Sequence, residues 1–273
     1  MTDHAPSSLS SDQAGTSTTL LLDQILKKAH PLLAEAINLA AVPHSYNADL
    51  LKALRARDDG RDEKLVARLA EFSFIWPAGD SLPEDGEQRE QRFTMQAAER
   101  ELLQLRWVAT DPEAFIAAHK RALAHYDAHP DPDPFVQDQI RLYHMLLADR
   151  KAGIEYLASS FRVYAGERRL AAADRLIDTT LEAHGYLVAL KSRALPRLDD
   201  LLAYMLGRLA QLRGQWDASL PRLKTLHEKG DLSPLLKPYV TRAYGLALAK
   251  AGDYVEAIKL YESALALFRK LPG

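Results

Sequence analysis

Two histidines at helical spacing are the side chains of this sequence best placed for metal chemistry. His125 and His129 lie four positions apart, and His119 precedes them in the same segment. A pair at this spacing points to one face of a helix and can chelate zinc. Pro130 follows directly, however, so His129 falls in a last turn, where histidine also suits the negative end of the helix dipole. We favour this structural interpretation and predict no metal ligands.

Two pairs of adjacent aspartates are the candidates for acid–base catalysis. They are Asp58-Asp59 and Asp199-Asp200. Neighbouring side chains on a helix point about 100° apart, so neither pair forms a catalytic dyad by itself. The first pair precedes Gly60 and favours a turn, whereas the second favours negative charge in the first turn of a helix. We therefore predict no catalytic residues and no enzyme, and a hydrolase site assembled from scattered side chains is the alternative.

Two other routes to catalysis are missing from the sequence. The chain contains no cysteine, which excludes thiol nucleophiles, disulfides and thiolate metal sites. It also contains no Gly-x-x-x-x-Gly-Lys-Ser/Thr segment, so no phosphate loop offers glycine amides and a lysine to a triphosphate. We predict no cofactor and no nucleotide hydrolysis.

Charge and hydropathy restrict the class of partner. The 273 residues include 35 Lys and Arg against 37 Asp and Glu. This near balance lacks the broad basic surface on which nucleic-acid binding depends. No apolar run approaches the roughly 20 residues that span a bilayer, and the N-terminus lacks the order of a secretory signal. We expect a cytoplasmic protein without a membrane partner, whose partner is a protein or peptide.

Apolar spacing predicts a mainly all-α fold in four parts. A Ser- and Thr-rich disordered tail over 1–18 is followed by a module over 19–108. A helical connector or degenerate repeats fill 109–194, and repeats occupy 195–273. Helical periodicity after the predicted strands is found near 98–108, 112–128, 134–148, 151–164, 167–184, 196–213, 216–229, 234–251 and 254–270.

An aromatic and β-branched stretch interrupts the helical pattern of the second part. Residues 72–76 favour a strand, Pro77 ends it, and residues 92–95 favour a return strand. Three or four helices followed by a small β-hairpin is the order of a winged-helix module. Trp76 has apolar neighbours and is predicted to anchor the core.

Two C-terminal segments align with each other. Gly207 matches Gly245, Gly214 matches Gly252, and an aromatic residue follows each second glycine by two positions. Gly245 would let two helices approach closely, and Gly252 fits the left-handed end of a helix. The last unit, residues 243–268, resembles the tetratricopeptide family in Gly-Asp-Tyr-x-Glu-Ala and Tyr-x-x-Ala-Leu. The preceding unit matches less well, because Ser219 stands where the family prefers alanine.

The tetratricopeptide resemblance implies an α-solenoid of helix pairs with a concave binding surface. Aromatic, aliphatic and basic side chains together suit an extended peptide, with arginine and lysine receiving its carboxylates. The alternative is that these side chains pack on an adjacent helix. The family pattern assigns the following residues to the concave surface: Tyr204, Arg208, Gln211, Tyr239, Arg242, Leu246 and Lys250.

A second resemblance covers the N-terminal half. Leu39-Ala40-Ala41-Val42-Pro43, then Asp49-Leu50-Leu51-Lys52-Ala53-Leu54, then Leu65-Val66-Ala67-Arg68-Leu69 is similar to the winged-helix segment of STAND-class signalling NTPases. This resemblance implies the C-terminal arm of such a protein, with the NTPase domain in a longer parent chain. Gln96-Ala97 stands where that family often has a histidine motif, which weakens a role linked to nucleotide state.

A DNA-binding regulator with a helical sensor domain is the competing function. The predicted recognition helix carries Arg61, Lys64 and Arg68 against Asp62, Glu63 and Glu71. The following segment, residues 80–90, carries five acidic residues against one arginine. Because non-specific DNA binding requires several phosphates to be neutralised, we do not expect nucleic acid as the partner.

Overall fold

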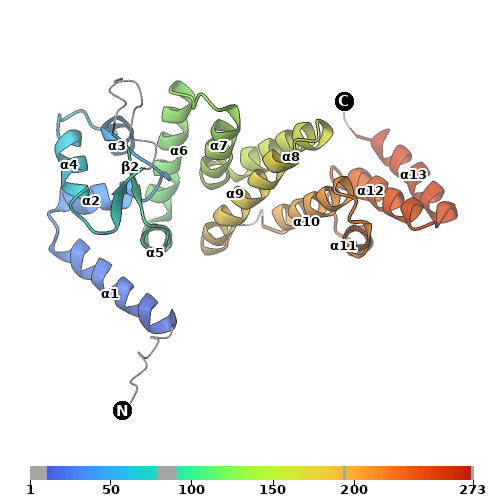
Figure 1. The fold of residues 1–273 in the computed structure, drawn as a ribbon, viewed down its shortest axis with the longest axis horizontal. Coiled ribbons are helices and arrows are strands. Elements are labelled where there is room, and N and C mark those ends of the chain that lie inside the picture. The colour runs from blue at the N-terminus through green and yellow to red at the C-terminus, as the bar shows by residue number, and fades with distance from the viewer. Residues whose placement is uncertain (1–10, 79–90, 193–194, 272–273) are drawn as a thin grey trace, which may run out of the picture. The chain divides into compact units, whose positions relative to one another are not determined.

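The computed structural model describes residues 11–78, 91–192 and 195–271, and the chain divides into two compact units, residues 1–129 and 130–273. The described part contains thirteen helices and one two-stranded sheet, which confirms the mainly helical prediction (Figure 1). None of the described helices is both long and apolar enough to cross a bilayer.

Unit 1, residues 1–129, combines six helices with the sheet. The helices are α1 (Ser11–Lys28), α2 (Pro31–Ala40), α3 (Ala48–Arg55), α4 (Asp62–Leu69), α5 (Ala97–Thr110) and α6 (Pro112–Ala128). Asn47 begins α3 by accepting a 2.9 Å hydrogen bond from the Leu50 amide, and Asp111 caps α6 through the Ala114 amide at 3.0 Å. Helix starts of this kind follow from a short polar side chain ahead of the first turn.

The start of α1 corrects the predicted tail. Residues 11–18 belong to this helix, whereas residues 1–10 of the predicted tail lie outside the described residues. Extending a helix costs less free energy than nucleating one. The apolar segment that begins at Leu20 therefore continues into residues of low helix propensity.

The sheet joins three parts of unit 1. Strand β1 (Ile75–Pro77) runs antiparallel to β2 (Phe93–Met95), with Ile75 opposite Met95. Tyr46, between α2 and α3, adds an isolated bridge to Phe93 through two main-chain hydrogen bonds of 2.8 Å. The hairpin is thus fixed to the segment that precedes α3.

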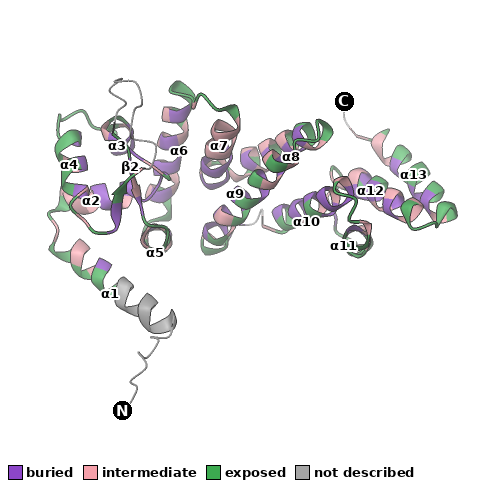
Figure 2. Cartoon of the chain, viewed as in Figure 1, coloured by how far each residue is buried: buried purple, intermediate pink, exposed green. Residues whose placement is uncertain are grey.

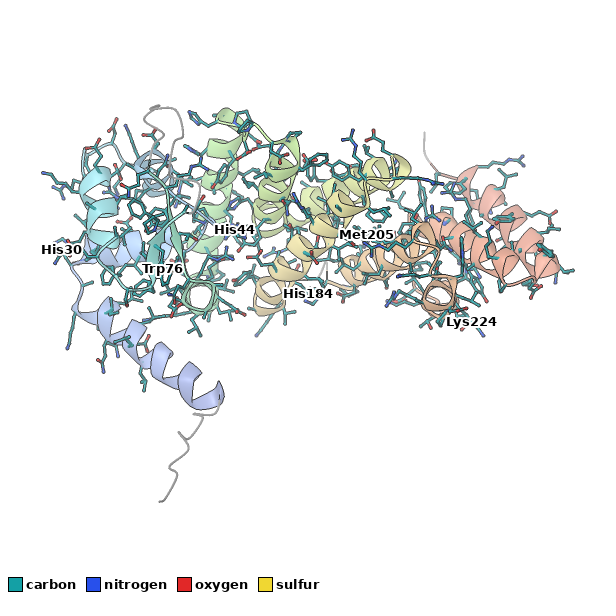
Figure 3. All side chains as sticks on the ribbon, viewed as in Figure 1. His30, His44, Trp76, His184, Met205 and Lys224 are labelled. Carbon is teal, nitrogen blue, oxygen red and sulfur yellow. The ribbon has the colours of Figure 1, made fainter. Side chains whose placement is uncertain are left out.

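Trp76 departs from the expected core position. Its side chain is 57% exposed, and its indole nitrogen donates to the Ser73 carbonyl at 2.8 Å (Figure 3). Side chains alternate across a strand, so the burial of Ile75 turns Trp76 outward.

Helices α2, α3, α4, α5 and α6 enclose the core of unit 1. Helix α2 contacts α3, α4 and α5, and α3 contacts α6. Figure 2 shows buried residues on these helices, and several large apolar side chains of unit 1 are fully buried. They include Ile37, Tyr46, Leu51, Leu54, Leu69, Leu103 and Phe115. The amide of Gln104 on α5 ties the end of α2 by donating to the Ala41 carbonyl at 2.7 Å.

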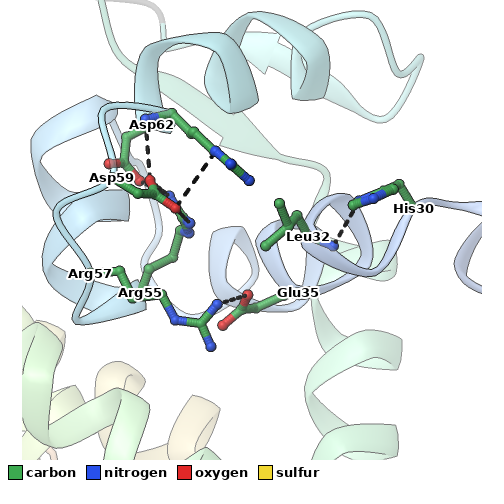
Figure 4. A network of polar contacts seen from close by, with 8 residues as sticks. His30, Leu32, Glu35, Arg55, Arg57, Asp59 and Asp62 are labelled. Carbon is green, nitrogen blue, oxygen red and sulfur yellow. Dashed lines mark hydrogen bonds and ion pairs between the residues drawn. The ribbon is translucent and has the colours of Figure 1, made fainter.

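A buried ion-pair network connects α3 to the start of α4. The Arg55 side chain is fully buried, and it donates to Asp62 at 2.6 Å and to Asp59 at 2.7 Å (Figure 4). Asp59 lies in the turn between the helices, so one guanidinium satisfies the turn and the first residue of α4. The pKa of Asp59 is lowered, chiefly by its hydrogen bond with Arg55.

Unit 2, residues 130–273, is all helical in its described part. Its helices are α7 (Pro134–Ala148), α8 (Arg150–Gly166), α9 (Leu170–Ala189), α10 (Leu195–Leu212), α11 (Trp216–Glu228), α12 (Lys237–Lys250) and α13 (Tyr254–Phe268). Helix α7 packs against α8 and α9, and each helix from α10 to α12 packs against the next one.

Two glycines end the first helix of the aligned C-terminal segments, as predicted for Gly252. Gly214 follows α10 with φ of 75°, and Gly252 follows α12 with φ of 91°. These left-handed positions let the next amide return to the helix, at 2.8 Å from Gln215 to Ala210 and at 3.0 Å from Asp253 to Leu248.

Candidate functional site

Aromatic and basic side chains from three helices of unit 2 gather on one surface. Tyr204 and Arg208 come from α10, Tyr239 and Arg242 from α12, and Arg162 from α8. We call these five residues the arginine–tyrosine surface. Arg162 and Arg242 are exposed, whereas the other three side chains are half-buried.

Ring contacts hold the two tyrosines in place. The rings of Tyr204 and Tyr239 meet edge to face with centroids 6.5 Å apart. Phe161 contacts Tyr204 from one side at 6.5 Å, and Phe268 contacts Tyr239 from the other at 4.9 Å. The tyrosines therefore form a supported aromatic platform rather than two separate exposed rings.

Three guanidinium groups border this platform. Arg162 lies over the Tyr239 ring at 6.0 Å from its centroid. Burial raises the pKa of Tyr204, and the positive charges of Arg208, Arg242 and Arg162 act against that rise. No ion pair within the described residues involves any of the three arginines. The surface is thus locally positive in a chain whose net charge is −2.

The structure separates the predicted concave residues into groups. Tyr204, Arg208, Tyr239 and Arg242 are brought together as described above. Gln211 is only 4% exposed, and its amide donates to the Ala243 carbonyl at 2.7 Å. That hydrogen bond joins α10 to α12, and the amide oxygen of Gln211 accepts a hydrogen bond of 2.5 Å from Arg208. Gln211 is therefore buried in the helix packing and positions one arginine of the surface.

The other two predicted residues lie further along α12. Leu246 is half-buried. Lys250 is exposed, and its Nζ lies 5.7 Å from the centre of the Trp216 ring on α11. Lys250 therefore has an aromatic contact of its own, away from the tyrosine pair.

Arg162 belongs to the surface but was not predicted from the sequence. It lies on α8, where the repeat pattern is too degenerate to assign a concave position. The signal that could have found it is the pair Phe161-Arg162, which places a buried aromatic next to an exposed cation.

The clustered histidines and the adjacent aspartate pairs have structural partners. His125 and His129 stack with ring centroids 4.6 Å apart at the end of α6. Burial lowers the pKa of His125, and the neighbouring His129 lowers it further. His119 is fully buried, with its ring 4.5 Å from that of Phe115. No group of three metal-ligating side chains occurs within the described residues.

Each aspartate of the two adjacent pairs has its own partner. Asp58 pairs with Lys52 at 2.9 Å, while its neighbour joins the Arg55 network. Asp199 binds His184 at 2.8 Å, and Asp200 binds Lys229 at 2.7 Å. The two carboxylates of a pair therefore do not share a proton, and both pairs stabilise local structure.

Two of the three cations of the predicted recognition helix lie beside carboxylates, whereas Lys64 forms no ion pair within the described residues. Arg68 pairs with Glu71 at 2.5 Å, and Arg61 lies 4.0 Å from Asp59. The acidic segment 80–90 lies outside the described residues.

The class defined by these observations is a mainly helical protein of two compact units. Comparison with protein-family models, with curated proteins and with solved structures finds no match for the chain.

Proposed function

We propose that the chain is a non-enzymatic interaction scaffold that holds a protein partner on the arginine–tyrosine surface. In this proposal unit 1 is a winged-helix module, and unit 2 is a solenoid of tetratricopeptide-like helix pairs. The observation that carries the proposal is a group of three arginines around two packed tyrosines, with no ion pair to any of the three within the described residues.

The chemistry of the surface favours an extended segment that carries carboxylates. Arginine presents planar, fixed donors that match a carboxylate with two parallel hydrogen bonds. Tyrosines supported from both sides lose little side-chain entropy when they pack against a ligand. An acidic peptide with apolar residues between its carboxylates would use both features.

A direct test uses a defined acidic peptide. The probe is a fluorescein-labelled octapeptide that alternates glutamate with leucine, and fluorescence anisotropy measures its binding to the full chain. Replacing both Arg208 and Arg242 with alanine should reduce the affinity about tenfold or more, because arginines that become buried against a partner contribute up to several kcal/mol at binding hot spots.

Two controls make the result specific. The matched variant Arg222→Ala removes an exposed arginine from α11 and should leave the affinity unchanged. The corresponding lysine–leucine octapeptide should bind more weakly than the acidic one. Equal binding of the acidic peptide by the double variant and the unchanged chain would contradict the proposal.

The order of its helices and strands supports a winged-helix module in unit 1. Helices α2, α3 and α4 followed by a hairpin, with Tyr46 bridged to β2, support the winged-helix interpretation. Together with residues 39–69, this order supports the C-terminal arm of a STAND-type signalling protein. The carboxylates beside Arg61 and Arg68 favour an interaction arm over the DNA-binding regulator. A salt-dependent gel shift of duplex DNA by the full chain would reverse that preference.

A further inference from the structure

The outer face of α13 carries a continuous row of exposed apolar side chains. Tyr254 is 66% exposed, Ile258 57%, Tyr261 36% and Leu265 52%. Val255, next to the first of them, is 70% exposed. Five of the thirteen large apolar side chains that are exposed in the described chain thus lie on this single helix.

The spacing makes these side chains one surface. Positions 254, 258, 261 and 265 are separated by four, three and four residues, which is the repeat of one helical face. A neighbouring face of α13, about 100° around the helix, is already used, because Ala257, Leu260 and Ala264 are buried against α12. A helix with an apolar outer face of this kind is the type of surface that another helix covers. We call the row Tyr254, Ile258, Tyr261 and Leu265 the α13 stripe.

The charges at the two ends of α13 indicate what covers it. Asp253 and Glu256 lie at its start, and Arg269 and Lys270 follow its end. Neither of these two basic residues forms an ion pair within the described residues. A second α13 in antiparallel orientation would bring its acidic start beside the basic end of the first.

We infer that the α13 stripe binds the α13 stripe of a second copy of this chain, forming a two-fold symmetric dimer. In such an interface the same residues serve both copies. Antiparallel pairing about the point midway between Tyr261 and Glu262 sets Ile258 of one copy opposite Leu265 of the other. It also sets Asp253 opposite Lys270 at both ends, so apolar and charged contacts form in the same register.

The first experiment measures the oligomeric state of the full chain. Light scattering after size exclusion should give twice the chain mass of 30.5 kDa at high concentration and a lower value on dilution. Leu265→Glu should give the monomer mass at the same concentrations. The matched control is Leu181→Glu on α9, since Leu181 and Leu265 are both 52% exposed. This control should remain dimeric, and circular dichroism should give the same helical spectrum for both variants.

The second experiment tests the orientation. The chain has no cysteine, so single cysteines report unambiguous contacts. A mixture of Ile258→Cys and Leu265→Cys chains, one carrying a size tag, should form a mixed disulfide dimer under mild oxidation. Each variant alone should not, because like positions lie seven residues apart along the antiparallel helices.

Three outcomes would overturn the inference. If the chain stays monomeric, the α13 stripe does not bind a second copy, and its partner would be another protein or a further helix. Disulfide formation by each variant alone would indicate parallel pairing. A monomeric Leu181→Glu variant would place the interface outside α13.

Discussion

Gly153 on α8 lies so close to Leu146 on α7 that a β-carbon added to it would stand 2.7 Å from the Leu146 main chain. Main-chain atoms cannot rotate away as a side chain can, so even one methyl group must push the two helices apart. The absence of a side chain at this residue therefore sets how closely the first helix pair of unit 2 can pack.

Replacing Gly153 with alanine should destabilise unit 2 by about 1–3 kcal/mol, because the added methyl group overpacks the contact. The control is Gly185→Ala on α9, where a β-carbon meets no atom within 4 Å. That variant should instead stabilise the chain by about 0.5–1 kcal/mol, since alanine is the better helix former. Urea unfolding measures both changes, and the same sign for both would contradict the close packing of α7 and α8.

The Arg55 network predicts that replacing Arg55 lowers the free energy of unfolding strongly, whereas replacing Arg57 lowers it only slightly. Arg55→Met leaves the carboxylate of Asp62 buried without its partner, which costs about 3–5 kcal/mol. Arg57 pairs with Glu35 at 3.5 Å with its side chain 56% exposed, so Arg57→Met should change stability by less than about 1 kcal/mol. Comparable effects in urea unfolding of the two variants would show that Arg55 is not the link between α3 and α4.

The spacing of apolar residues predicted where the helices lie better than it predicted which of their side chains are buried. The segment 134–148 coincides with α7, and Gly252 takes the expected left-handed conformation. Gln211 falls on the concave side of the repeat pattern, yet it is buried by a hydrogen bond to Ala243 on another helix. Periodicity assigns a residue to a face of its helix. It does not reveal a hydrogen-bond acceptor on another helix, such as the Ala243 carbonyl, so the burial of Gln211 could not be predicted.

The same limit explains why part of the candidate site was found and part was missed. Arg208 and Arg242 lie in the two segments that align with each other, so the alignment could assign both residues to the same face of the repeat. Arg162 lies in a segment whose repeat pattern is lost, with Gly153 in place of the alanine. Its position beside Tyr239 depends on how α8 packs, and packing becomes apparent only in three dimensions.

The buried His119 predicts how the stability of the chain depends on pH. Burial lowers its pKa from 6.5 to about 3, so the folded chain keeps it neutral where the unfolded chain binds a proton. Stability contributed by this group is complete above about pH 6.5 and is lost as the pH falls, by about 1.4 kcal/mol per unit. His119→Leu should flatten the pH dependence of the unfolding free energy between about pH 6.5 and 5. The control His30→Asn changes an exposed ring, keeps a capping side chain ahead of α2 and should keep the slope, whereas equal slopes for the unchanged chain and His119→Leu would contradict a neutral buried histidine.

Replacing Arg162 distinguishes most clearly between a surface that binds a partner and one that only packs internally. Its guanidinium is exposed and contacts the Tyr239 ring, with no carboxylate partner among the described residues. If the ring contact were its whole purpose, Arg162→Ala would change stability by less than about 1 kcal/mol and would not affect the acidic octapeptide. As part of the binding surface, Arg162 should contribute to affinity, so that Arg162→Ala weakens the peptide about tenfold and reduces the dependence of its affinity on salt. Arg162→Lys keeps the charge but loses the planar donor pair, and it should restore only part of the affinity. Full affinity in the alanine variant would restrict the partner to the α10 and α12 side of the surface and remove α8 from it.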